Sequence, residues 1–158
     1  MRVKIKKLWP VIAGLFLFFA IQPAKASDTS LKNFESDYCT YFPEGTLEKP
    51  DLWKSCCFDH DLRYWFGGSS ADMLMADNKL RNCVTQKAGS FYGNLMYYGV
   101  RAGHFSPVKN ERKWSWGWNF ERAFKPLDPQ EKKIINHALN ELNLDREYLK
   151  AFKKFYSL

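Results

Sequence analysis

The sequence of 158 residues lacks an apolar run long enough to cross a membrane. Its main apolar stretch, Leu8–Ile21, has 14 residues and contains Pro10, whereas a spanning helix needs roughly 20 apolar residues. Internal repeats and low-complexity segments are also missing. A composition of 46% apolar and 26% charged residues excludes general disorder. These properties predict a single packed domain.

A large excess of positive charge is also missing once the N-terminal residues are set apart. The chain carries 24 basic and 17 acidic side chains, but residues 1–26 hold five of the basic ones and no acidic one. The remaining balance of 19 against 17 gives no support for a nucleic-acid partner. The basic start, the apolar stretch and the small residues of Ala24-Lys25-Ala26 predict a signal peptide over residues 1–26. The chain from Ser27 onward is then secreted or periplasmic, and an uncleaved membrane anchor is the alternative.

Cysteines are few, and all of them follow the predicted signal peptide. An even number of cysteines in an oxidising compartment predicts two disulfides. Cys56 and Cys57 are neighbours and could pair with each other only through a strained ring. Two pairings therefore remain open, Cys39–Cys57 with Cys56–Cys83, or Cys39–Cys56 with Cys57–Cys83. A zinc site built from these cysteines and His60 is the competing interpretation.

Patterns typical of strands are scarce, so the predicted fold class is mainly α. A first helix over about residues 50–65 is predicted between Pro50 and the pair Gly67-Gly68. A second helix is predicted from a capping-box sequence at Ser69 to about Lys87. The short connection between them predicts an antiparallel helix hairpin.

Two more helices are predicted in a C-terminal helical extension, over about residues 100–158. Asp128-Pro129-x-Glu131 is typical of a helix start, and this helix is predicted to end near Leu142. Asp145 is predicted to cap a last helix over Arg146–Tyr156. Between these regions, Trp114-x-Trp116-x-Trp118-x-Phe120 has the period of two that fits an extended segment.

Polar side chains share one face of the first predicted helix. Cys57, His60, Asp61 and Tyr64 stand at positions i, i+3, i+4 and i+7. An imidazole and a carboxylate are costly to bury without partners. Asp77, on the second helix, is the predicted partner of His60.

The register of the predicted hairpin supports this pairing. Facing residues in an antiparallel hairpin have a nearly constant index sum, which is 137 for His60 with Asp77 and 139 for Cys56 with Cys83. One register can therefore bring the carboxylate to the imidazole and also close a disulfide nearby.

These residues predict a hydrolytic site. A carboxylate on one imidazole nitrogen fixes the tautomer and leaves the other nitrogen free to accept a proton. No nearby serine or cysteine has the pattern of an activated nucleophile, so water is the predicted nucleophile and His60 the general base. Asp61 beside His60 predicts a bound cation, and its hard oxygen ligands favour calcium over zinc. His104 and His137 are interpreted as surface or packing residues.

Two motifs carry a resemblance to a known family. Cys56-Cys57-Phe58-Asp59-His60-Asp61-Leu62-Arg63-Tyr64 resembles the C-C-x-x-H-D-x-x-Y core of secreted phospholipases A2. Asp37-Tyr38-Cys39-Thr40-Tyr41-Phe42-Pro43-Glu44 resembles the D-x-C-T-x-x-P-D calcium loop of the short bacterial and fungal members. The resemblance covers Asp37 to about Val84.

The resemblance implies a role for each matched residue. It makes the region of about residues 37–88 a disulfide-linked catalytic helix hairpin within a single domain over residues 27–158. His60 is the implied base, Asp77 the carboxylate that orients it, and Tyr64 a hydrogen-bond donor to Asp77. The implied calcium ligands are the Asp37 and Asp61 side chains and the Tyr38 carbonyl. The implied disulfides are Cys39–Cys57 and Cys56–Cys83.

The function implied is that of an exported, calcium-dependent phospholipid esterase. A phospholipid at a membrane surface is then the substrate. The alternative is a protein of the same fold without catalysis, which binds lipid or protein. A disulfide-stapled structural domain with no ligand is a third possibility.

The C-terminal extension offers a hypothesis about membrane contact. Basic residues at Lys109, Arg112 and Lys113 lead directly into Trp114, Trp116 and Trp118. Indoles favour the headgroup level of a bilayer, and basic residues favour anionic lipid. The three indoles could therefore dock on lipid. The alternative is that this segment packs on the helix hairpin and closes the core.

Overall fold

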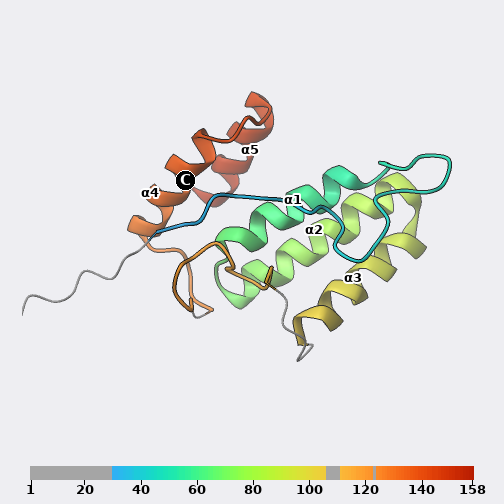
Figure 1. Cartoon of the computed structure of the whole chain (residues 1–158), viewed down its shortest axis with the longest axis horizontal. Coiled ribbons are helices and arrows are strands. Elements are labelled where there is room, and N and C mark those ends of the chain that lie inside the picture. Colours follow the sequence, from blue (N-terminus) through green and yellow to red (C-terminus); the bar gives the residue numbers. More distant parts are fainter. Residues whose placement is uncertain (1–29, 106–110, 123) are drawn as a thin grey trace, which may run out of the picture.

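The computed structural model describes residues 30–105, 111–122 and 124–158, except for the Phe105 side chain (Figure 1). The predicted signal peptide and Lys109 lie outside these residues. The described part of the chain is mainly helical, as predicted, and has no strand beyond an isolated bridge between Leu31 and Trp118. The helices are α1 (Lys54–Phe66), α2 (Ser70–Ala88), α3 (Ser90–Phe105), α4 (Pro129–Asn140) and α5 (Arg146–Tyr156). None of them, within the described residues, has the length and hydropathy needed to span a bilayer.

Helix α1 begins later than predicted. Pro50 belongs to a turn, in which the Leu52 N–H donates to the Lys49 carbonyl at 3.1 Å. The end of this turn is bonded to the preceding loop, since the backbone N–H of Trp53 donates to the Glu44 carbonyl at 2.9 Å. The helix can therefore begin only at Lys54. Its end is as predicted, with Gly67 as the C-cap at φ 72°.

Helices α1 and α2 form the predicted antiparallel hairpin. The capping box at the start of α2 is present, because the Ser69 hydroxyl accepts from the Asp72 N–H and the Asp72 carboxylate accepts from the Ser69 N–H. Cys56 on α1 is bonded to Cys83 on α2, in the predicted register.

Helix α3 was not predicted. It follows α2 after Gly89 and packs on it, so the first three helices lie in the order α1, α2, α3 (Figure 1). The two backbones approach closely at Gly93, where an added Cβ would stand 2.7 Å from the Arg81 carbonyl oxygen. Glycine at this position allows α3 to lie against α2.

Helices α4 and α5 cover the C-terminal end of α1. The predicted capping box of α4, formed by Asp128 and Glu131, is present, as is the Asp145 cap of α5. Helix α4 ends at Asn140 rather than near Leu142. A buried cluster joins the three helices, and it comprises Leu62, Trp65, Phe66, Trp118, Ile135, Leu139, Phe152 and Tyr156.

The tryptophan segment closes the core and is not a strand. Trp114 and Trp118 are buried. Their indole N–H groups donate to the Gly68 carbonyl at 3.1 Å and the Phe66 carbonyl at 2.7 Å, at the end of α1. Trp116 is half-buried and packs against the same core. These partners hold the indoles of Trp114 and Trp118 inside the protein, which favours the alternative that the segment packs on the helix hairpin and closes the core over membrane contact by these two residues.

Candidate active site

His60, Asp77 and Tyr64 meet between α1 and α2, as the sequence predicts. The His60 Nε2 atom lies 3.0 Å from Asp77 Oδ1, and the Tyr64 hydroxyl donates to the same oxygen at 2.7 Å. The register of the hairpin makes this possible, because positions 60 and 64 are one turn apart on α1 and face the same residue of α2. With Asp77 accepting the Nε2 proton, Nδ1 is the nitrogen that can act as a base.

A third donor to Asp77 comes from α3. Arg101 Nη1 donates to Asp77 Oδ2 at 3.0 Å. Asp77 is fully buried, and burial by itself raises a carboxyl pKa. The hydrogen bonds from His60, Tyr64 and Arg101 outweigh the burial, so the pKa of Asp77 is lowered. Burial and the neighbouring Asp77 charge raise the pKa of Tyr64. Asp77 is therefore an ionised carboxylate, and Tyr64 is a neutral phenol. In these states Asp77 can accept a hydrogen bond from His60, and Tyr64 can donate one to Asp77.

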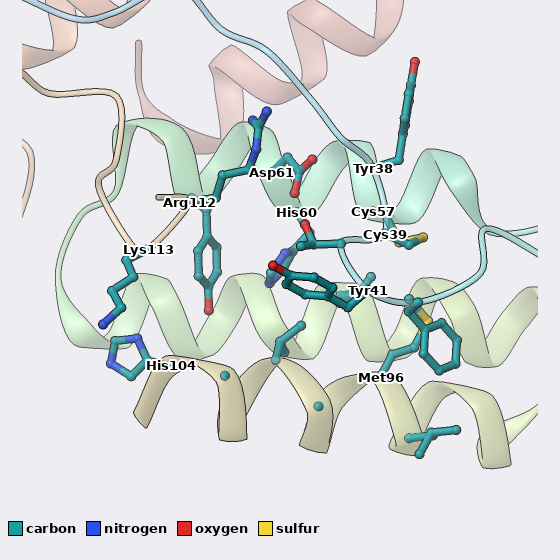
Figure 2. Close-up of a pocket in the computed structure, with 18 residues that line it drawn as sticks. Tyr38, Cys39, Tyr41, Cys57, His60, Asp61, Met96, His104, Arg112 and Lys113 are labelled. Atoms are coloured by element: carbon teal, nitrogen blue, oxygen red, sulfur yellow. A yellow bond between two sulfur atoms is a disulfide. The ribbon is translucent and has the colours of Figure 1, made fainter. Parts of the chain in front are cut away.

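The imidazole lines a cavity of about 340 Å³. Its walls come from the loop before α1, from α1 itself, and from α2 and α3 (Figure 2). Met96 lies at one end of the cavity, whereas Arg112, Lys113 and His104 gather toward the other (Figure 2). The apolar side chains of Leu80 and Leu95 also line the cavity. A cavity of this size with one apolar and one basic end can hold a small amphiphilic anion.

Asp61 is buried beside the imidazole. Within the described residues, its one hydrogen-bond donor is the Ser36 hydroxyl, 2.6 Å from Oδ2. Burial raises the pKa of Asp61 to about 6, against the opposing effects of Ser36 and His60. The nearby Asp37 charge raises this pKa further, by a smaller amount. The positive charge of Arg112 lowers this pKa, but it does not outweigh the burial.

Asp37 is engaged by other side chains. Arg112 Nε lies 3.1 Å from Asp37 Oδ1, and the Thr40 hydroxyl donates to Oδ2 at 2.9 Å. Arg112 also donates to the Glu35 carbonyl and stacks over the Trp116 ring, 5.0 Å from its centroid. Arg112 lines the cavity together with Tyr38 and Asp61. The guanidinium therefore pairs with one predicted calcium ligand, Asp37, and lines the cavity together with another, Asp61.

The donor set fits calcium, although Arg112 competes for part of it. Asp37 and Asp61 supply hard carboxylate oxygens, and the burial of Asp61, which the charges of His60 and Arg112 only partly offset, favours a further cation. Among the described residues, no group of three or more His, Cys, Asp or Glu side chains could hold a metal ion. Such a group is not required here, because the predicted set contains two carboxylates and the Tyr38 carbonyl.

Four residues of this site were not identified as such from the sequence. Arg101 and His104 lie on α3, which was not predicted, and Arg112 and Lys113 were assigned to membrane contact. His104 lines the cavity and was interpreted as a surface or packing residue. No local sequence motif marks these positions, because the folding of α3 and the return of the chain near residue 112 bring them to the cavity.

The cysteines form the pairing that the family resemblance implied. Cys39 is bonded to Cys57, and Cys56 to Cys83. With all four thiols in disulfides, the competing zinc site is wrong, because it needs thiolate ligands. Two disulfides are compatible with a protein located outside the cytoplasm.

Comparisons with family models, with curated proteins and with solved structures found no match to this chain.

Proposed function

We propose that this protein is an exported, calcium-dependent esterase of phospholipids, of the phospholipase A2 type. The observation that carries the proposal is the His60 imidazole, held through Nε2 by the buried Asp77 carboxylate on the wall of an amphiphilic cavity. The motifs around Cys56–Tyr64 and Asp37–Glu44 support it, because they resemble the core and the calcium loop of that family.

The chemistry follows from the free ring nitrogen. His60 Nδ1 takes a proton from a water molecule, and the resulting hydroxide attacks the carbonyl carbon of the acyl ester. The tetrahedral species then collapses with cleavage of the bond to the glycerol oxygen. The imidazolium returns its proton to that oxygen, which gives a fatty acid and a lysophospholipid. Asp77 stabilises the imidazolium between these steps.

Calcium belongs to the same proposal. The Asp37 and Asp61 side chains and the Tyr38 carbonyl would hold it. When bound, it supplies Lewis-acid polarisation of the ester carbonyl and neutralises the phosphate, contributions of several kcal/mol in comparable metal sites. Arg112 must then release Asp37 or share it.

The test is fatty-acid release from phosphatidylglycerol and phosphatidylcholine vesicles, with calcium and with chelator. We expect release that depends on calcium and falls by about 10²–10⁴ in His60→Gln, the range typical of general-base loss. Tyr64→Phe removes one donor to Asp77 and should cause a smaller loss with a shifted pH profile. Melting temperatures of all variants control for folding.

Absence of release by the folded, calcium-loaded wild type would refute the esterase. Retained lipid binding in that case would favour the non-catalytic alternative. Fatty-acid release that is unaffected by His60→Gln would show that His60 is not the general base.

A further inference from the structure

Arg101 joins α3 to the carboxylate that orients His60. Its Nη1 atom donates to Asp77 Oδ2 at 3.0 Å, whereas His60 and Tyr64, both on α1, bond the other oxygen, Oδ1. Helix α2, which carries Asp77, lies between α1 and α3 (Figure 1). Each oxygen of this carboxylate is therefore held from a different neighbouring helix. Among the described residues, Arg101 is the one donor to Oδ2.

The register of α2 and α3 places Arg101 at this position. Contacts between the two helices have a constant index sum, as expected of an antiparallel pair. The sum is 178 for each of three close pairs, which are Thr85 with Gly93, Arg81 with Tyr97, and Asp77 with Arg101. The Arg101 side chain is 24% exposed, and the Asp77 side chain is fully buried. The contact is therefore set by the packing of α3 on α2.

Asp77 needs a donor on each oxygen to hold the plane of its carboxylate. The terminal torsion of an aspartate is broad and roughly two-fold, so the side-chain rotamer does not fix this plane. Two donors on Oδ1 fix the place of that atom and leave the group able to turn about it. A buried oxygen without a donor is costly. Without Arg101, the carboxylate would therefore turn to share the donors of Oδ1 between both oxygens, which weakens its bond to His60.

We propose that Arg101 is a positioning residue of the candidate active site. By holding Asp77 Oδ2, it keeps Oδ1 aligned with His60 Nε2, and so keeps the imidazole in the tautomer whose Nδ1 is basic. Arg101 does not line the cavity, so it acts through Asp77. The base is then oriented only when α3 packs on α2. The effect on catalysis rests on the proposed function, but the tautomer of His60 can be measured without any reaction.

The experiment compares three Arg101 variants with a matched control. Arg101→Met and Arg101→Gln have side chains that end short of Nη1, one apolar and one polar, so a folding defect of either leaves the other for the test. Arg101→Lys keeps a charged donor of similar reach. The control is Arg81→Met, which removes a guanidinium 5.5 Å from the Tyr97 ring, in the same helix pair and one turn from Asp77.

The first measurement is the tautomer of His60, read from the NMR shifts of its ring nitrogens at alkaline pH in chelator. Wild type, Arg81→Met and Arg101→Lys should show one tautomer, protonated at Nε2. Arg101→Met and Arg101→Gln should show a mixture of both tautomers. The wild-type tautomer in these two variants would overturn the proposal.

The second measurement is hydrolysis of a short-chain phospholipid, dispersed as monomers, with kcat and KM determined separately. Arg101→Met and Arg101→Gln should lower kcat by about 10–100-fold, as removal of a group behind a functional histidine does in metal sites. KM should change little, because Arg101 does not line the cavity. Arg101→Lys should restore most of kcat, and Arg81→Met should retain it.

Two kinetic results would show that Arg101 is only a structural contact. One is an equal loss of kcat in Arg101→Lys and Arg101→Met, and the other is an equal loss in Arg81→Met and Arg101→Met. Absence of hydrolysis by every form, wild type included, refutes the esterase. The tautomer of His60 then decides alone whether Arg101 positions the imidazole.

Discussion

Burial of Asp61 makes the stability of the protein depend on pH. Its pKa is about 6 in the folded chain and 3.8 in an unperturbed carboxyl, so the folded state holds this proton more tightly. The stabilising contribution is complete below about pH 4 and is lost as the pH rises through 6. An asparagine at position 61 cannot ionise, so the Asp61→Asn variant does not lose this stability as the pH rises. In chelator, the stability of Asp61→Asn relative to wild type should therefore rise by about 3 kcal/mol between pH 3 and pH 8.

Urea denaturation of the two proteins at several pH values measures this difference. Asp51→Asn, at an exposed carboxylate, is the control and should show little change. A difference between Asp61→Asn and wild type that stays constant with pH would mean that Asp61 titrates normally.

At the residue scale, we expect Arg112 to weaken calcium binding at the proposed site. Its guanidinium is partly exposed and pairs with Asp37, and such pairs contribute up to about 1 kcal/mol. Arg112→Gln frees a carboxylate and removes a like charge from the site. It should therefore bind calcium about fivefold more tightly in titration calorimetry.

Lys150→Gln, which makes the same change in net charge on α5, is the control and should leave the affinity unchanged. Weaker calcium binding by Arg112→Gln would show that the guanidinium supports the site instead of competing for it.

At the scale of elements, a buried ion pair joins the end of α1 to the start of α4. Arg122 bonds both carboxylate oxygens of Glu131 at 2.9 Å, and its Nη1 donates to the Gly68 carbonyl at 3.1 Å. Arg122→Met leaves the Glu131 charge buried and should cost about 3–5 kcal/mol of unfolding free energy.

The double variant Arg122→Met with Glu131→Gln keeps a capping acceptor without the charge. It should recover part of that loss in chemical denaturation. Equal stabilities for the single and double variants would show that the charge of Glu131 is not the cause.

The helices that the sequence predicts are those with local start and stop residues. Helix α2 has Ser69 and Asp72 at its start, and α4 has Asp128 and Glu131, so short-range hydrogen bonds define both. Helix α3 has glycines at 93, 99 and 103, which oppose a helix when considered alone. It forms because Gly93 lets it pack on α2, and this long-range contact has no local pattern.

The same distinction applies to the candidate site. The contact of His60 with Asp77 is predictable because a helix hairpin has a fixed register, whereas the hydrogen bond from Tyr64 to Asp77 was implied by the family resemblance. Arg101 and Arg112 reach Asp77 and Asp37 from regions whose positions depend on tertiary packing. Pro50 shows the converse error, since a residue suited to a helix start is used in a turn fixed by Trp53.

At the scale of the whole molecule, the two disulfides run in different directions from adjacent residues. Cys57 is bonded to the loop at Cys39, and Cys56 to α2 at Cys83. In an extended chain, Cys39 meets Cys56 and Cys57 with nearly equal probability, because loop-closure entropy changes little when a loop grows by one residue. Only a formed helix, which turns the side chain by about 100° per residue, separates the two thiols in space.

The order of events during oxidative folding therefore matters for this chain. Thiols that oxidise before α1 has formed give a mixture of two isomers with the same mass and the same number of bonds, and one of them pins the loop and α2 to the wrong sides of the helix. Thiols that oxidise on a formed α1 give a single isomer. Formation of α1 before oxidation thus selects the native disulfide pairing. Slow oxidation in a buffer that allows thiol–disulfide exchange should therefore raise the yield of the native isomer.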